Sequence, residues 1–358
     1  MSVALLPYVD APAVQRSLND IYQRNPSEPA PELAFLTSAA NTNNVLEYTV
    51  SPKNGHQYQA QVIYTPRITE AEATTTLTTD CESGFKMGDL THTYELDALT
   101  GAQHSISFNI ADLRKRLELN PEYLGRAIMA LMDVVKRKVQ TGAATQMAVL
   151  GGKFATDGGE NASLLSVNNT LKTVKTKYAA ALDGGKTNPE CLQEIMFSAQ
   201  NSGFVGKPVV FGLGEIFRYM QLLGSSGEYS AGGLNFLKMY GDLSIPYLPS
   251  LRMHNALNPS TGNKFLVVDA GAMHLLQYNK FNDPLSKINQ DNLIMDVIYD
   301  PETDLGFNYK FYLNPCGEKI TIIMSTAYKV VGLPDDMYAG GDRLEGTNGV
   351  LTFAITNS

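Results

Sequence analysis

Residues 120–140 carry the signals of one long helix, and a helix of that length fixes the size of the layer that packs against it. Asn120 can cap the first free amides, Pro121 suits the first turn, and Glu122 complements the positive end of the helix dipole. At ~1.5 Å per residue the helix is about 30 Å long, enough to cross a domain. Apolar residues recur three and four positions apart and predict one buried stripe. The stripe consists of Leu124, Ile128, Leu131, Val135 and Val139.

The residues before this helix predict an arm followed by a β-hairpin. In residues 1–44 the apolar spacing indicates a short amphipathic helix, and closely spaced prolines after it favour an extended segment that lies against something outside its own core. Residues 45–66 are predicted to form the hairpin around the turn Lys53-Asn54-Gly55, because Asn-Gly is the strongest short hairpin signal. The alternating positions are largely polar on both faces, so the ribbon is expected to need a neighbour. Short β-type runs continue to residue 110.

The residues after the long helix indicate a mixed α/β region and then a β-rich end. A helix is predicted over residues 167–182 and another from residue 188 to about residue 201. A strand followed by a helix is predicted in residues 207–223 and again in residues 264–278, which indicates helices covering a central sheet. The predicted strands of the β-rich end are residues 292–300, 305–313, 318–334 and 349–356.

Composition excludes several classes of protein. A chain of 358 residues with 44% apolar and 18% charged residues is an ordinary folded protein of one large or two modest domains. A net charge of −8 argues against a protein that grips nucleic acid over its whole surface. Cys81, Cys191 and Cys316 form no paired motif, which favours reduced thiols. No signal peptide is expected, because the first apolar run is broken by Pro7. No membrane helix is expected, because no stretch approaches the ~20 apolar residues that such a helix needs.

No motif for cofactor or metal binding is convincing. Gly212-Leu-Gly214 follows a predicted strand as a dinucleotide fingerprint would, but Phe217 stands where the third glycine belongs, so a plain strand-to-helix turn is favoured. The histidines are scattered singly, and His92 near Cys81 is interpreted as part of a polar loop. We therefore expect neither a cofactor nor a metal.

No motif for catalysis is convincing either. Cys191 at a helix start is interpreted as a buried thiol. The carboxylates of the glycine-rich loop could do acid–base work, but turn chemistry is favoured. They are Asp335, Asp336, Asp342 and Glu345. We therefore expect no catalytic residue.

Three basic runs occur, one just before the predicted helix, one in its last turn and one after it. They are Arg114, Lys115 and Arg116; Lys136, Arg137 and Lys138; and Lys172, Lys175 and Lys177. We interpret each run as a solvated face. If the runs shared one surface, they could neutralise nearby DNA or acidic groups of a sister subunit.

The order of arm, hairpin, long helix, α/β region and β-rich end resembles the major capsid proteins of tailed bacteriophages, with the Hong Kong phage-type or Johnson fold. The resemblance covers nearly the whole chain, and residues 264–280, 305–328 and 331–353 are similar to recurring phage capsid sequence. It implies an α+β fold with an N-terminal arm, an extended loop, a spine helix in a peripheral domain and an α/β axial domain. The implied segments are 1–44 for the arm, 45–100 for the extended loop with its flanking strands, 101–184 for the peripheral domain, 185–285 for the axial domain, and 286–358 for the return strands of the peripheral domain and the C-terminal segment.

The resemblance also implies a function and partners. Copies of the chain would form hexamers and pentamers of an icosahedral shell around double-stranded DNA, with no enzymatic activity. Because only a short arm precedes the hairpin, a separate scaffolding protein is expected, with a portal and decoration proteins. The protein would be made in a bacterial cytoplasm and reside in the virion. Lys53, Asn54, Gly55 and His56 at the loop tip would contact another subunit, and the first two basic runs would face a subunit or the genome.

Three alternatives remain open on the sequence alone. A compartment shell of the encapsulin type shares this fold but would present a cargo-peptide site. An enzyme could use the carboxylate loop that begins at Asp335 and ends at Glu345. Another virion structural protein, such as a tail-tube subunit, would form rings or tubes instead of closed shells.

Overall fold

The computed structural model describes the chain in separate ranges. They are residues 10–24, 30–37, 45–52, 57–64, 90–97, 102–120, 122–156, 172–178, 186–188, 190–201, 204, 208–225, 236–239, 243–259, 262–290, 292–314, 318–332 and 349–356.

The first six-stranded sheet has the order β10-β14-β13-β12-β11, with β4 paired to the other side of β14. The strand β13 shows the period of two of a half-buried strand: Phe307, Tyr309 and Phe311 are buried, while the residues between them are half-buried. All pairings in the sheet are antiparallel. The strands are β4 (Ala102–Asn109), β10 (Met273–Tyr278), β11 (Ile288–Gln290), β12 (Leu293–Tyr299), β13 (Gly306–Leu313) and β14 (Lys319–Gly332).

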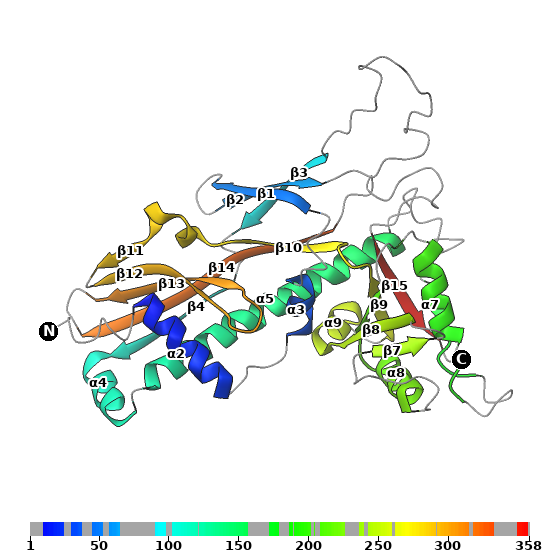
Figure 1. Ribbon diagram of the computed structural model, residues 1–358, viewed down its shortest axis with the longest axis horizontal. Helices are drawn as coiled ribbons and strands as arrows, with labels where there is room; N and C mark the ends of the chain where they lie inside the picture. The colour runs from blue at the N-terminus through cyan, green and yellow to red at the C-terminus, as the bar shows by residue number, and fades with distance from the viewer. Residues whose placement is uncertain are drawn as a thin grey trace, which may run out of the picture.

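One helix, α5 (Tyr123–Thr156), packs along β4 and β14 of the first sheet and continues to β15 of the second (Figure 1). The predicted apolar stripe of this helix is confirmed, since all of its residues are at most 4% exposed. The predicted end at residue 140 is wrong, because the helix has 34 residues and extends to Thr156. Gly142 and Ala143 break the pattern of large apolar residues without ending the helix. A Cβ atom at Gly142 would collide with the Tyr328 hydroxyl, so glycine allows a close approach to the sheet.

The second six-stranded sheet has the order β5-β15-β9-β6-β8-β7 and is covered on both faces. Phe265 and Phe353 stack with ring centroids 5.3 Å apart in the core shared with α7 and α8, whereas Phe211 and Leu266 belong to the core shared with α5 and α9. The strands are β5 (Lys172–Val174), β6 (Val209–Gly212), β7 (Phe236–Met239), β8 (Leu243–Pro249), β9 (Lys264–Val268) and β15 (Val350–Ile355). The helices are α7 (Glu190–Asn201), α8 (Glu215–Ser225) and α9 (Leu251–Leu257).

A smaller antiparallel sheet of three strands lies beside β10 and β14 (Figure 1), and we call it the ribbon. It consists of β1 (Val45–Pro52), β2 (Gln57–Tyr64) and β3 (Leu90–Asp97). The predicted hairpin is confirmed, with Val45 opposite Tyr64 and Tyr48 opposite Val62. The third strand pairs along the whole of β2.

Three further helices flank the first sheet and α5. The predicted amphipathic helix is confirmed as α2 (Ala11–Arg24), whose Val14, Leu18 and Ile21 are buried. A short helix, α3 (Pro31–Leu36), forms where an extended segment was predicted, because Pro31 is compatible with a first turn. The helix α4 (Ile110–Leu119) follows β4, and Asn109 caps it by accepting from the Ala111 amide at 2.9 Å. Short 3-10 turns, η3 (Lys280–Asn282) and η4 (Pro284–Ser286), lead into β11.

Two predicted helices are wrong. The segment Met273–Tyr278 is the strand β10, paired to β14, because a short apolar run fits a strand as well as a helix. Within the predicted helix 167–182, the described residues form β5, which pairs in parallel with β15, and a bridge between Lys177 and Thr187. The other predicted helices after α5, and the strands of the β-rich end, are confirmed.

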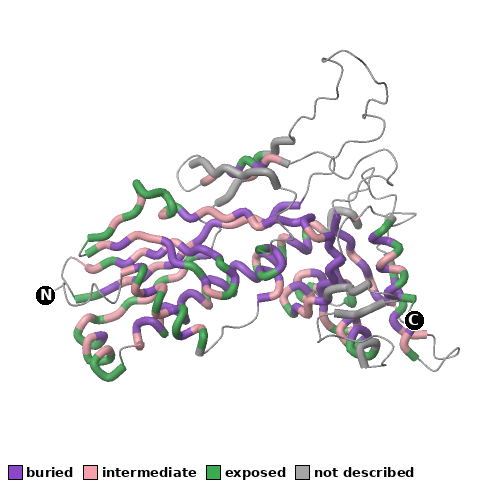
Figure 2. The backbone as a smooth tube through the Cα atoms, in the orientation of Figure 1, coloured by how far each residue is buried: buried purple, intermediate pink, exposed green. Residues whose placement is uncertain are grey.

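The expected α+β class is confirmed, since sheets and helices alternate as separate layers around shared cores (Figure 2). Buried residues concentrate along α5 and along the strands that face it, as Figure 2 shows. Within the described ranges, no helix is long and apolar enough to cross a membrane.

Candidate functional site

The described residues assemble no metal centre. They contain no group of three or more His, Cys, Asp and Glu side chains that could hold a metal ion. Cys191 is buried in α7, and burial raises the pKa of its thiol to about 12, so it is protonated at neutral pH. The carboxylate loop, Cys81 and Cys316 lie outside the described residues.

The glycines of the suspected dinucleotide motif form the turn from β6 into α8. Gly214 adopts a φ of +76°, which favours glycine, and α8 begins at the next residue. A Cβ atom at Gly212 would lie 2.9 Å from side-chain atoms of Ile216 and Phe265, so this glycine allows helix and strand to pack closely. The interpretation as a plain structural turn therefore accounts for both glycines.

One face of the ribbon is packed against the chain's own first sheet. Ala60 and Val62 of β2 are fully buried, and the rings of Tyr58 and Tyr278 lie 4.1 Å apart between centroids. On β3, the Tyr94 ring lies 5.8 Å from the Lys329 ammonium of β14. The packed face thus combines aliphatic burial with aromatic contacts to β10 and β14.

The opposite face of the ribbon is exposed at its centre. Gln61 and Thr93, which pair across β2 and β3, are exposed, whereas Gln59 and Ile63 are half-buried. The predicted contact residues of the tip, Lys53, Asn54, Gly55 and His56, lie outside the described residues, between the paired ends of β1 and β2.

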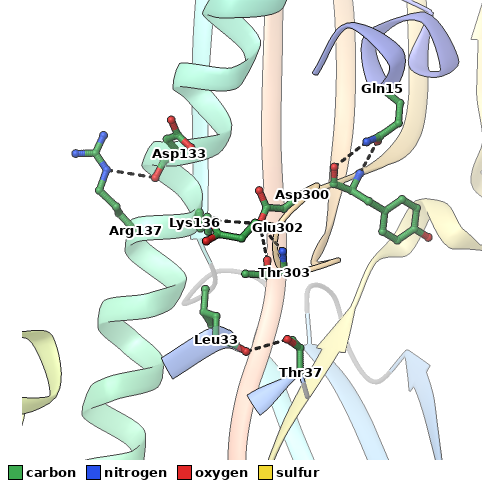
Figure 3. A network of polar contacts seen from close by, with 10 residues as sticks. Gln15, Leu33, Thr37, Asp133, Lys136, Arg137, Asp300, Glu302 and Thr303 are labelled. Atoms are coloured by element: carbon green, nitrogen blue, oxygen red, sulfur yellow. Dashed lines mark hydrogen bonds and ion pairs between the residues drawn. The ribbon is translucent and has the colours of Figure 1, made fainter. Parts of the chain in front are cut away.

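The basic run of α5 does not form one surface, which corrects the predicted solvated face at Lys136. This lysine is 3% exposed, and its Nζ lies 3.0 Å from Asp300 Oδ2 and also contacts Glu302 (Figure 3). Burial alone would lower the pKa of Lys136, but the hydrogen bonds and charges of Glu302 and Asp300 outweigh burial and raise it. Lys136 is therefore a charged structural residue. Arg137 and Lys138 are exposed, as predicted for a solvated face.

The basic run of α4 lies at the surface with one anchored member. Lys115 and Arg116 are exposed, and Arg114 is half-buried. Arg116 donates to the Tyr123 hydroxyl at 2.8 Å, and its guanidinium lies 5.0 Å from the centre of that ring. This contact fixes the start of α5 relative to α4.

The turn between β12 and β13 is held from two sides. Asp300 Oδ2 accepts from the Thr303 amide at 3.0 Å and from its hydroxyl at 2.6 Å, in addition to Lys136. Gln15 of α2 accepts from the Tyr299 amide at 2.7 Å and donates to the Tyr299 carbonyl at 2.9 Å (Figure 3). Gln15 of α2 and Lys136 of α5 thus hold the same turn from two sides.

A buried polar contact, which we call the arm junction, joins the helix α3 to α5 and to the start of α9. It consists of Glu32 of α3, Gln140 of α5 and Ser250, the N-cap of α9. Glu32 is fully buried, accepts from Gln140 Nε2 at 2.7 Å and contacts the Ser250 hydroxyl. Ser250 in turn accepts from the Met253 amide at 3.0 Å. Sequence reasoning missed this site, since no local pattern joins residues so far apart in the chain.

Comparison with known proteins gives structural neighbours only. No family model and no curated protein matches the sequence. The chain is similar to the capsid asymmetric unit of cyanophage A-1(L), with 11% identity, a TM-score of 0.49, and 93% of this chain and 95% of that chain covered. It is similar to the capsid of Ralstonia phage GP4, with 12% identity, a TM-score of 0.41, and 84% and 83% covered. The holo-SrpI encapsulin complex from Synechococcus elongatus gives 11% identity, a TM-score of 0.38, and 94% of each chain covered.

Proposed function

We propose that this chain is a major capsid protein of a tailed bacteriophage, and that its copies form the hexamers and pentamers of an icosahedral shell around double-stranded DNA. The observation that supports this most is the ribbon. One face of it is anchored by Ala60 and Val62 on the chain's own sheet, while the opposite face exposes Gln61 and Thr93 at its centre. An anchored ribbon with one exposed face can overlap a neighbouring subunit without losing its position on its own subunit.

The architecture suits a protein whose function is assembly. A 34-residue helix joins two sheets into one elongated support, which can transmit a fixed geometry from one contact to the next. Many modest contacts in a closed lattice give a stable shell through multivalency, so each interface need bury only a modest area. Within this proposal residues 53–56 contact a neighbouring subunit. No catalytic function is proposed, because the described side chains converge on structural contacts.

The proposed division of the chain follows the expected segments. Residues 1–44 are the arm, 45–100 the extended loop, 101–184 the peripheral domain, 185–285 the axial domain, and 286–358 the return strands with the C-terminal segment. Three strands cross these limits in space. The strand β10 lies in the first sheet with β14, whereas β5 and β15 lie in the second sheet, where β15 pairs with both β5 and β9.

The proposed partners follow from the charge distribution and from the shell. A net charge of −8 limits adhesion to the packaged genome, while Lys115, Arg116, Arg137 and Lys138 supply exposed positive charge for weak, sequence-independent contact with phosphates. A separate scaffolding protein, a portal and decoration proteins complete the proposed particle, and the mature protein resides in the virion.

Shortening the ribbon tests this function. Deleting residues 51–57 should leave a folded subunit, because the described core lies in the two larger sheets, but should abolish shells. The matched control is Lys53→Ala, which keeps the length of the hairpin and should assemble. Folding is followed by thermal denaturation and assembly by electron microscopy. Normal shells from the deletion variant would show that the ribbon has no role in assembly.

A further inference from the structure

The strand β4 forms one rim of the first sheet and is paired only with β14 among the described residues. Its register with β14 is continuous from Asn109 opposite Lys319 to Ala102 opposite Thr326, without a bulge. The sequence AQHSISFN contains no lysine, arginine, carboxylate or proline. A long, regular and uncharged edge strand is a template for pairing with another strand.

The backbone groups that point away from β14 can be identified. The Ile110 amide donates to the Glu318 carbonyl at 3.0 Å, so this pair lies at a hydrogen-bonded position of the antiparallel ladder. Hydrogen-bonded pairs alternate with non-bonded pairs, and the amides of Ser105 and Ser107 therefore point outward. The amides of Gln103 and Asn109 point outward as well, because both residues are an even number of positions from Ser105. Side chains at all of these positions are exposed.

Most other edges in the described ranges are protected, and in the second sheet the edge strands β5 and β7 have only three and four residues. On the far side of the first sheet β11 has three residues, and the exposed Lys287 precedes it. In the ribbon, the register of β1 shifts between Val45 and Glu47, and β3 carries Glu95 and Asp97. Short edges, irregular edges and charged edges all resist pairing. Among the described edges, only β4 and β10 lack all of these features, and β4, with eight residues against six, is the longer of the two.

We propose that β4 pairs in antiparallel fashion with β4 of a second copy of this chain. Copies with a net charge of −8 repel one another, so contact between them is favoured where the surface is uncharged, as it is along β4. The register that uses every outward residue places Ser105 opposite Ser107 of the second copy and Gln103 opposite Asn109. In this register the two copies of β4 pair over their full length, and no like charges face each other across the pair.

This pairing has two-fold symmetry, and the inference rests on the proposed function. Rings of subunits are closed by head-to-tail contacts, which join unlike surfaces. A contact in which the same surface meets itself can join one ring to the next in a shell. The pairing of β4 with its own copy supplies such a contact and places it between rings.

The test removes one outward amide. Ser105→Pro deletes a donor that β14 does not use, so the subunit should keep its thermal transition, while Ser105→Ala keeps the amide and is the matched control. We expect Ser105→Pro to give rings or smaller species with at least about tenfold fewer shells by sedimentation and electron microscopy, and Ser105→Ala to assemble like the unmodified chain. Shells of normal number from a folded Ser105→Pro variant would overturn the pairing and leave the proposed function intact. Failure of the unmodified chain to assemble with its scaffold would contradict the proposed function itself.

Hydrogen exchange provides a measurement that needs no variant. In the unassembled subunit, the outward amides of Ser105 and Ser107 should exchange rapidly, and in the shell they should be protected by pairing. Equal exchange of residues 103–109 in subunits and shells would overturn the proposal, whatever the behaviour of Ser105→Pro.

Discussion

Glu32 Oε2 accepts a hydrogen bond of 2.7 Å from Gln140 Nε2, so a fully buried carboxylate of the arm is held by the long helix. The neighbouring Phe35 ring packs edge-on against Phe211 of β6, with centroids 5.1 Å apart. The helix α3 therefore touches α5 and the second sheet at once. Residues 1–44 were expected to lie against something outside their own core, and the helix α3 of this segment packs between α5 and the second sheet.

Replacing Glu32 should loosen the arm junction. Glu32→Ala leaves Gln140 and Ser250 without their acceptor and opens a cavity, which should cost about 2–3 kcal/mol of unfolding free energy. Glu32→Gln keeps the volume and one acceptor and should cost less. Denaturant unfolding measures the cost, and amide exchange in residues 31–36 locates it. Equal stability of Glu32→Ala and the unmodified chain would contradict the role of the arm junction.

Removing the buried lysine should be among the most damaging changes in α5. Lys136→Met leaves Asp300, whose side chain is fully buried, without its cation and should lower the unfolding free energy by about 3–5 kcal/mol. Lys138→Met, on the exposed side of the same helix, should change it by less than about 0.5 kcal/mol. The two variants are compared by their denaturant midpoints. Similar midpoints would mean that the ion pair of Lys136 and Asp300 contributes nothing to the unfolding free energy.

His274 predicts a specific loss of stability in acid. Burial lowers the pKa of its imidazole from 6.5 to about 4, an effect that a backbone hydrogen bond with Gly271 only partly offsets. Below pH 6.5 the unfolded chain binds a proton that the folded chain does not, so the contribution present above pH 6.5 is lost as the pH falls towards 4. The loss should be about 3 kcal/mol. His274→Gln should remove this component, which is measured by denaturant midpoints at the two ends of the range.

The two faces of the ribbon should respond differently to a charge. Val62→Asp places a carboxylate at a fully buried position and should detach the ribbon from β10 and β14. Gln61→Asp, one residue earlier on the opposite face, should leave it attached. Amide exchange in residues 57–64 and 90–97 should rise only in Val62→Asp. The same exchange in both variants would show that the ribbon is not held by this face.

Sequence reasoning succeeded where local signals agree. Asn188 accepts from the Glu190 amide at 3.0 Å and begins α7 as a cap-proline-acid motif predicts. The hairpin of β1 and β2 and the strands β12 and β13 carry clear alternation and turn signals. Their tertiary environment agrees with their local preference, which is why they were predicted.

The failures have identifiable physical causes. Three successive residues of a helix point in directions about 100° apart, so Lys136, Arg137 and Lys138 were bound to face different surroundings. Lys136 lies next to Val135 and three positions before Val139 of the buried stripe, a signal that could have placed it inward. Its partners Asp300 and Glu302 lie more than 160 residues away in the chain, and no local pattern identifies them. No local sequence pattern indicates the long-range pairing of β10 with β14 either.

The central claim is tested most directly by negative-stain electron microscopy of the purified protein, with a sedimentation profile of the same sample before and after addition of a candidate scaffolding protein. The proposed function predicts closed polyhedral shells, or rings of five and six subunits that become shells with the scaffold. A small monodisperse species that forms no particle, even with phage lysate or scaffold added, would contradict it.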